Sequence, residues 1–590
     1  MKKRSEVKSN LKWNIEDIFA TDQEWESLYG EVEKQIDFSA FQGNLSKKEI
    51  LLKCFKELDK VSYNLEKLSV YAFMRHDEDT ANSFYNAMMT KCDNLEMAFS
   101  SQISFIMPEL TSLSNDTLQS FIDDEDFVDY DYQLKCILKE KPHVLSRETE
   151  QVLALGGQVF QGFHSIFGMI NNADLPFPEI EIDGEKITVS HGTYSLLLQS
   201  KNREAREKAF KEYYKAFIGL INTISQTYIG NVNKNVFLAR ARKYNSCLEK
   251  ALLSEDVDKV VYDNLIEATK KALPILHDYV ANKKSELKYD EMHMYDIYVP
   301  IVDNVELALE YEDAFKLVKE GLKPLGEEYT SLLQKAFDER WIDVEETENK
   351  RSGAYSIHVY ALKHPYVLLN YQKTTNDIFT IAHELGHSLH SHFSAKAQPQ
   401  SKADYKIFVA EVASTVNEVL LLKHLLNSTT DVKLKKYLLS YYMDMIKSTL
   451  FRQTMFAEFE YKVHTACENN QPLTKDFLNQ IYLDLNKEYY GNAIISDDEI
   501  QYEWCRIPHF YRAFYVYKYA TGIISAISIA ERIYSEGEVA VNDYFKFLSS
   551  GGSDSPVELL KLAGVDLTKT TAFESAMESF KNALEQYKKL

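Results

Sequence analysis

Apolar residues recur at helical spacing along most of this chain. One long stripe in the first part consists of Leu51, Phe55, Leu58, Leu65 and Leu68. Ser46 and Glu49 have the spacing of a capping box, so we expect Ser46 to be the N-cap of this helix. Comparable patterns fill residues 200–340 and 405–547 and resume after 555, and only 20 Gly and 12 Pro interrupt 590 residues. The pattern predicts a mainly α-helical fold.

Two regions of the chain have strand-like patterns instead. Residues 179–189 alternate polar and apolar side chains around an Asp-Gly pair, which predicts a β-hairpin. Residues 353–360 and 366–371 are rich in aromatic and β-branched side chains, and they predict a small β-region. A helix follows, with Asn376 or Asp377 as its expected N-cap. We expect residues 1–200, which include the hairpin, to form an N-terminal helical lobe and residues 201–590 to form a catalytic domain.

Charge and composition narrow the class of protein. The formal net charge is −22 and the pI is about 5.3, and such a field repels phosphate backbones, so we expect no nucleic-acid partner. The best apolar run, 522–530, is too short to span a bilayer, and the basic N-terminus has no apolar stretch behind it. The six cysteines have no paired spacing, which is typical of reduced thiols. Together these features predict a cytoplasmic protein with no membrane partner.

The chemistry is concentrated in His383, Glu384 and His387, which form an HExxH motif. On a helix, residues i and i+4 lie about 40° apart around the axis and about 6 Å along it. Two imidazoles placed in this way can share one Zn²⁺ ion at about 2.0–2.1 Å each. Glu384 lies on a neighbouring face, where it can act as general base toward the attacking water.

A third zinc ligand is expected from a second helix. The first helix can run to about Ala395, and a return helix from about Tyr405 brings Glu411 back to the level of His387. Glu411 would complete a His₂Glu site for one Zn²⁺ per chain.

Two further residues near the metal motif have alternative interpretations. Glu418 lies on the Glu411 face, where it either orients a histidine ligand or forms a solvated salt bridge. His390 is the rival third ligand, but it lies about 4.5 Å beyond His387 along the helix axis. This position favours a packing role, or a contact with a residue that binds the metal, over direct binding of the metal.

Several segments resemble one known family over nearly the whole chain. They are Trp13–Phe19, Tyr295–Tyr298, Gly353–Ser356, Pro365–Tyr371, the metal block Phe379–Ser391, Ile507–Tyr511 and Gly551–Pro556. With Glu411 at the position of the family's glutamate ligand, the chain resembles the thimet-oligopeptidase-like zinc metallopeptidases, and within them the oligoendopeptidase F branch. The metal block is the most specific of these segments.

The resemblance implies more than the residues alone. It implies a large helical ellipsoid with a deep substrate channel and zinc at its floor, so that unfolded oligopeptides enter and folded proteins do not. It also implies that His509, with Tyr511 and Tyr515, binds substrate and stabilises the oxyanion. The spacing from this histidine to the tyrosines departs from the thimet type. We expect Tyr511 and Tyr515 to share one helical face.

These observations predict a zinc-dependent metalloendopeptidase that acts on short oligopeptides. The strand at 366–371 could pair with the substrate backbone as an added β-strand. One alternative is a zinc carboxypeptidase or dipeptidyl-carboxypeptidase on a similar scaffold. Another is a peptide-binding protein without turnover, which would have no need of Glu384. The sequence does not specify the cleavage preference or the oligomeric state.

Overall fold

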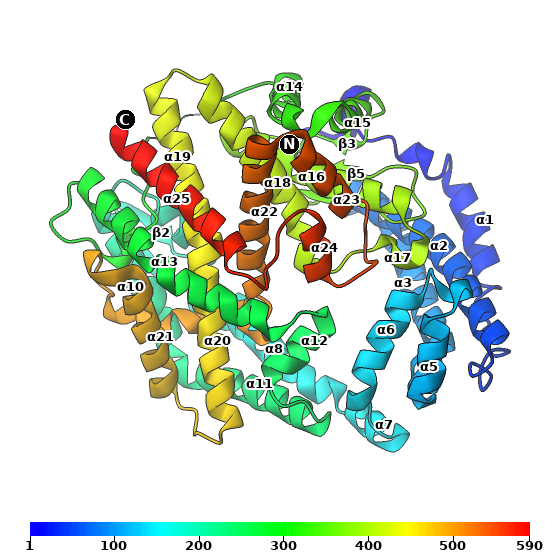
Figure 1. Cartoon of the computed structure of the whole chain (residues 1–590). Coiled ribbons are helices and arrows are strands. Elements are labelled where there is room, and N and C mark those ends of the chain that lie inside the picture. The colour runs from blue at the N-terminus through cyan, green and yellow to red at the C-terminus, as the bar shows by residue number, and fades with distance from the viewer. Residues whose placement is uncertain (304, 306) are drawn as a thin grey trace. The chain divides into compact units, whose positions relative to one another are not determined.

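Helices dominate the computed structural model, which describes residues 1–303, 305 and 307–590 (Figure 1). This confirms the predicted mainly α fold. The internal contacts divide the chain into two units. Unit 1 comprises residues 1–142, 306–428 and 525–566, and unit 2 comprises residues 143–305, 429–524 and 567–590.

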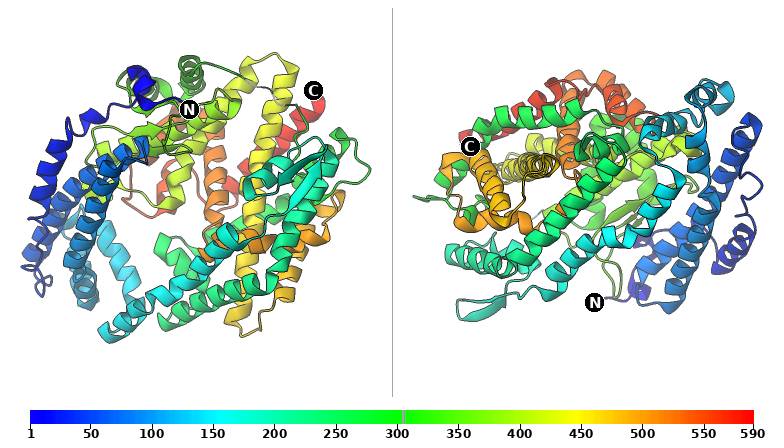
Figure 2. Two further views of the ribbon diagram at one scale, coloured as in Figure 1. Left: turned by 180° about the vertical axis from the view of Figure 1, so that it is seen from behind. Right: turned by 90° about the horizontal axis from the view of Figure 1, so that it is seen from below.

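Unit 1 carries the predicted metal-binding motif. Its α-helices are α1 Asp22–Val32, α2 Lys48–Glu78, α3 Ser83–Ile103, α4 Ile106–Ser112, α5 Asn115–Ile122, α6 Asp131–Glu140, α14 Tyr311–Gly321, α15 Gly326–Asp338, α16 Thr375–Ala397, α17 Gln400–Ala403, α18 Ile407–Ser428, α23 Glu538–Leu548 and α24 Pro556–Leu562. Figure 2 shows the long helices α2 and α3 side by side. The stripe predicted on α2 is buried at Leu51, Phe55, Leu65 and Leu68. However, α2 begins at Lys48 with Lys47 as N-cap, so the prediction of Ser46 as N-cap is wrong by one residue.

Unit 2 is also mainly helical. Its α-helices are α7 Arg147–Leu155, α8 Gly157–Met169, α9 His191–Leu197, α10 Arg203–Gly219, α11 Ile221–Ala241, α12 Cys247–Glu255, α13 Lys259–Glu286, α19 Val432–Ile446, α20 Arg452–Glu468, α21 Lys475–Tyr490, the first part of α22 Tyr517–Glu536, and α25 Thr571–Lys589. The C-terminal helix α25 packs against α13 and α19 (Figure 1). The predicted hairpin is confirmed as β1 Glu179–Ile182 and β2 Glu185–Thr188, with positive φ at both turn residues, Asp183 and Gly184.

A small sheet in unit 1 lies next to the helix of the metal motif. It consists of β3 Ile342–Asp343, β4 Tyr355–Ile357 and β5 Tyr366–Leu368 in the order β3-β5-β4. β5 pairs in parallel with β3 and antiparallel with β4, so both of its edges are occupied. The prediction that the 366–371 strand pairs with substrate is therefore wrong, because its backbone groups already bond within the sheet. The two edge strands of this sheet are β3 and β4.

The N-terminal segment packs against this sheet. Trp13 is buried, and its ring lies 6.2 Å from that of Tyr366 on β5. The buried carboxylate of Asp343 on β3 accepts from Arg4 at 2.7 Å and from Lys350 at 2.7 Å. The first residues of the chain therefore hold this sheet in place. The sheet in turn contacts α16 through β4 and β5.

Helix α16 begins two to three residues earlier than predicted. Thr374 is its N-cap and accepts from the N–H of Asp377, while the Asp377 carboxylate accepts from the N–H of Thr374 at 2.9 Å. Asp377 therefore serves as the far partner of a capping box rather than as the cap. The return helix α18 begins at Ile407, two residues after the predicted start, and a short helix, α17, lies between the two.

The two units do not coincide with the regions 1–200 and 201–590, which stay a prediction about sequence domains. Unit 1 joins the first 142 residues to two segments far along the chain. Among the described residues, no helix combines the length and the apolar character that crossing a membrane requires.

Candidate metal centre and active site

Three predicted ligand residues converge in unit 1. His383 and His387 lie one turn apart on α16, and their Nε2 atoms are 3.2 Å apart. The Oε2 atom of Glu411 on α18 lies 3.3 Å from the Nε2 atom of each histidine. These residues form the one group of three or more potential ligands found in the described part of the chain.

The spacing of these three atoms fits a zinc ion. A tetrahedral ion with bonds of about 2.0–2.1 Å has ligand atoms about 3.3 Å from one another. The three separations, 3.2, 3.3 and 3.3 Å, match that value. The donor set of two imidazoles and one carboxylate is also that of catalytic zinc sites, which keep the fourth position open.

Gly386, inside the motif, permits α18 to approach closely. A Cβ atom at this position would lie 2.5 Å from Ser414 Cα and 2.7 Å from Ala413 O, both on the α18 backbone. The two helices are also joined by Asn417, whose amide donates to Ala382 O at 2.9 Å. Glu411 therefore reaches the histidines because a residue without a side chain faces α18 at the crossing.

Glu418 contacts the ligand histidine that faces it. Its Oε1 atom lies 2.6 Å from His383 Nδ1, while Nε2 of the same ring faces Glu411. A carboxylate on Nδ1 fixes the tautomer and orientation of a histidine ligand. The geometry therefore suits the orienting role that the sequence left open for Glu418.

The cluster is strongly polarised before any ion binds. Burial lowers the pKa of His383, but hydrogen bonds to Glu411 and Glu418 outweigh burial and raise the pKa to about 10. Burial raises the pKa of Glu411, but the two histidines outweigh it and hold the pKa far below its ordinary value. The arrangement thus favours a positive charge at this position.

Glu384, the predicted general base, is 7 % exposed. Burial and the nearby Glu411 raise its pKa, while His383, His387 and a hydrogen bond from the Ser356 backbone lower it; the pKa remains above its ordinary value. Ser356 belongs to β4, and its hydroxyl lies 2.8 Å from that of Ser388 on α16. The edge strand β4 and the base are therefore in direct contact.

His390 lies outside the ligand cluster. It is 1 % exposed, and its ring stacks on Tyr405 at 3.8 Å and 5° and packs on Phe547 at 5.0 Å. Burial lowers its pKa to about 3. This placement agrees with the packing alternative predicted for His390.

The predicted oxyanion residues His509, Tyr511 and Tyr515 lie in unit 2. Pro508–Tyr511 form a short 3₁₀ turn, and Phe514 has a φ of 56°, so no continuous helix joins Tyr511 to Tyr515. The prediction that these two tyrosines share one helical face is wrong for this reason. The Tyr511 ring is buried and stacks on Phe167 at 4.4 Å.

Tyr519 is the residue that the sequence reasoning missed here. Its hydroxyl lies 3.3 Å from His509 Nε2, and its ring lies 5.5 Å from that of Tyr515. Tyr519 lies in the first turn of α22, and Tyr515 lies two residues before that helix; their separation of four residues could have indicated that they lie close together. The structure thus groups His509 with Tyr515 and Tyr519.

The bend at Phe514 is held by α20. The N–H of Phe514 donates to Oε1 of Glu460 at 3.1 Å, and the ring of His464 lies 4.8 Å from the Phe514 ring. Glu460 is fully buried, and burial raises the pKa of its carboxyl well above the ordinary value. A buried carboxyl group, whose neutral form burial favours, therefore supports the strained residue next to Tyr515.

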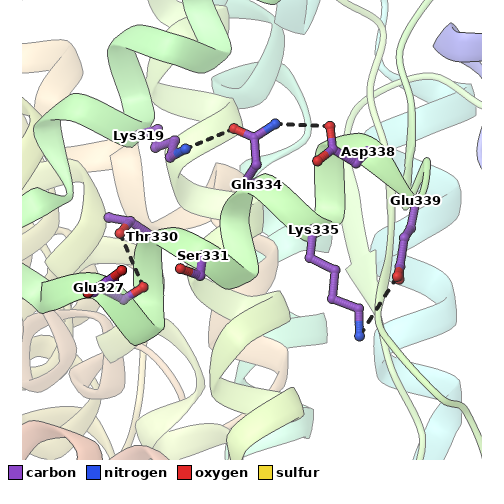
Figure 3. A pocket seen from close by; sticks show the side chains of 8 residues that line it. All are labelled: Lys319, Glu327, Thr330, Ser331, Gln334, Lys335, Asp338 and Glu339. Carbon is purple, nitrogen blue, oxygen red and sulfur yellow. Dashed lines mark hydrogen bonds and ion pairs between the residues drawn. The ribbon is translucent and has the colours of Figure 1, made fainter.

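A separate hollow of about 520 Å³ in unit 1 lies on α14 and α15 (Figure 3). Its polar side chains bond to each other: Lys319 donates to Gln334 at 2.8 Å, and Gln334 donates to Asp338 at 3.0 Å. Because these groups satisfy one another, we assign this surface no binding role.

Comparison with known proteins agrees with this geometry. Residues 196–579 match the model of peptidase family M3, and residues 109–177 match that of oligopeptidase F. The chain belongs to peptidase family M3. This membership identifies the protein as a peptidase, and its similar relatives place it in the oligoendopeptidase F branch.

The similarity extends over the whole chain. It is 42 % identical to oligopeptidase PepF of Bacillus subtilis (strain 168) over 591 residues, which cover all of this chain and 88 % of the relative. A putative peptidase from Chlamydophila abortus has a TM-score of 0.95 at 34 % identity, covering 100 % of this chain and 99 % of the other. Oligoendopeptidase-F from Enterococcus faecium has a TM-score of 0.73 at 34 % identity, with coverages of 96 % and 99 %.

Proposed function

We propose that this member of family M3 is a zinc-dependent endopeptidase that hydrolyses short, unfolded oligopeptides. The observation that carries the proposal is the tetrahedral spacing of His383 Nε2, His387 Nε2 and Glu411 Oε2 next to the buried carboxylate of Glu384. The names of the relatives support oligopeptides as the class of substrate.

His383, His387 and Glu411 would hold one Zn²⁺, which supplies a Lewis acid that polarises a carbonyl and activates water. Glu384 would take the proton of the attacking water and pass it to the departing amine. Its raised pKa makes it a stronger base than a solvated glutamate. Glu418 would keep the Nε2 lone pair of His383 directed at the metal.

Residues of unit 2 would stabilise the oxyanion. His509 with Tyr515 or Tyr519 offers N–H and phenol donors, which suit a developing negative charge. Tyr511 was predicted for the same role, but its ring packs on Phe167, and we propose Tyr519 in its place. We also propose, from the sequence, a substrate channel and a cytoplasmic location.

An internally quenched peptide of about ten residues, blocked at both ends, tests the function. We expect cleavage at an internal bond, loss of activity with a chelator and recovery with Zn²⁺, while the same segment within a folded protein survives. A carboxypeptidase or dipeptidyl-carboxypeptidase would leave this blocked peptide intact and would cut only a version of it with a free C-terminal carboxylate. A peptide-binding protein would bind the peptide and leave it intact.

A further inference from the structure

A cavity of about 360 Å³ in unit 2 shares a wall with Tyr515. Its lining includes Asn235 of α11, Lys250 and Glu255 of α12, and Arg512, Tyr515 and Lys518. The guanidinium carbon of Arg512 lies 4.7 Å from the centre of the Tyr515 ring, and Lys518 Nζ lies 5.0 Å from it. A ligand in this cavity would therefore lie directly beside a residue proposed to act on the substrate.

The charges that line the cavity do not cancel. Lys518 forms an ion pair with Glu255, which is the one acidic residue lining the cavity. Arg512 and Lys250 form no ion pair with any carboxylate among the described residues. The lining of this cavity therefore carries an excess of positive charge, although the formal charge of the chain as a whole is −22.

The surroundings of Lys250 add to this imbalance. Burial lowers the pKa of Lys250, and the positive charge of Arg242 lowers it further. Behind it, Lys234 donates to the neutral amide oxygen of Asn231 at 2.7 Å, and burial followed by the charge of Lys250 lowers the pKa of Lys234. An anion in the cavity would offset the cost of holding these ammonium groups close together.

We propose that this cavity is a carboxylate subsite of the peptidase. It would bind the C-terminal carboxylate of an oligopeptide, or an Asp or Glu side chain near the cleaved bond, through Arg512 and Lys250. Arg512 suits this role because its planar guanidinium can bind a carboxylate through two parallel hydrogen bonds. The proposal rests on the proposed function and adds a preference for acidic peptides.

Matched peptides test the subsite on the full-length, zinc-loaded enzyme. One pair differs only in a free acid or an amide at the C-terminus, and further pairs carry Glu or Gln at single positions on either side of the cleaved bond. We expect the favoured acidic member to have a KM about fivefold lower, as for an accessible charge pair. The pair that shows the difference identifies the source of the carboxylate.

Substitutions then locate the effect. In R512Q and K250Q, the KM advantage of the acidic peptide should disappear while kcat/KM for its neutral partner stays near wild type. R512E should reverse the preference toward a peptide with Lys at the same position, which also tests the site if K250Q fails to fold. K215Q is the matched control, because Lys215 is an exposed lysine of unit 2 on α10 and should leave both peptides unchanged.

The failures are distinguishable. If no blocked peptide is cut, the proposed function fails. If peptides are cut but acidic and neutral members have equal KM, or if R512Q and K250Q affect both members equally, the carboxylate subsite is wrong and the peptidase proposal stands.

Discussion

At the scale of single residues, the metal group depends on contacts that are invisible in the HExxH motif itself. The motif identifies His383, Glu384 and His387, and helix geometry adds Glu411. The importance of Gly386 could not be predicted, because it follows from where the α18 backbone passes. Tyr519 was missed for a similar reason: the bend at Phe514 turns Tyr511 into the interior and brings Tyr519 to His509.

The substitution G386A tests the close approach of the helices. The added methyl group would lie 2.5 Å from Ser414 Cα, so α18 must move and carry Glu411 away from the histidines. We expect loss of stoichiometric zinc and a free energy of unfolding lower by about 1–3 kcal/mol. The control is G30A, since a Cβ atom at Gly30 in α1 meets no atom within 4 Å and alanine favours helix. Equal zinc content in G386A and G30A would contradict the account.

A second pair of variants separates ligand from packing residue. E411A should purify nearly free of metal, because it removes one of three converging ligand atoms. H390F should retain zinc, because phenylalanine keeps the stack on Tyr405 and Phe547. Elemental analysis after dialysis against a weak chelator measures both. Zinc in E411A together with an empty H390F would show that the ligand assignment is wrong.

Zinc affinity should rise with pH. The pKa of His383 in the metal-free protein is about 10, above its ordinary value, so a proton must leave when zinc binds near neutral pH. The same proton stabilises the metal-free fold fully below about pH 6.5, and this stability is lost as the pH rises through about 10. Chelator competition should give a Kd that falls about tenfold per pH unit between about pH 7 and 9. A constant Kd over that range would exclude a protonated His383.

At the scale of elements, the sequence predicts where helices and strands form better than it predicts which strands pair with one another. The hairpin at 179–189 and the strands near 355 and 366 were found because alternation and β-branched residues act locally. β3 has two residues, too few for a pattern, yet it occupies one edge of β5, the strand that had been expected to pair with substrate. The cap of α16 was misplaced because Asp377 suits both positions of a capping box.

The turn that precedes α22 provides the test at this scale. Because burial raises the pKa of Glu460 and so favours its neutral form, we expect glutamine to replace it with little loss. E460A removes the acceptor of the Phe514 N–H, which should cost about 1–3 kcal/mol and lower kcat. A carboxyl group whose pKa is raised in the folded state contributes less to the stability of the protein as the pH rises. The free energy of unfolding of E460Q should therefore increase relative to that of the wild type at alkaline pH. Urea unfolding at two pH values measures these free energies. An equal loss of stability in E460Q and E460A would contradict the assignment of a neutral carboxyl group to Glu460.

At the scale of the whole molecule, the proposed chemistry draws on both units. Unit 1 contains the metal group and the base, and unit 2 contains His509, Tyr515 and Tyr519. Unit 1 is assembled from three separate segments, so no boundary at a single residue could have described it. Family membership was predictable because the metal block is specific, whereas the composition of the units depends on long-range packing that periodicity does not encode.

The most direct test of the central claim is the activity of E384Q with its zinc content measured in the same sample. Glutamine keeps the size of the side chain but cannot accept the proton of the attacking water. We predict unchanged zinc, unchanged peptide affinity and a kcat lower by several orders of magnitude. A variant that contains zinc and retains a tenth of the wild-type kcat would contradict the role of Glu384 as general base.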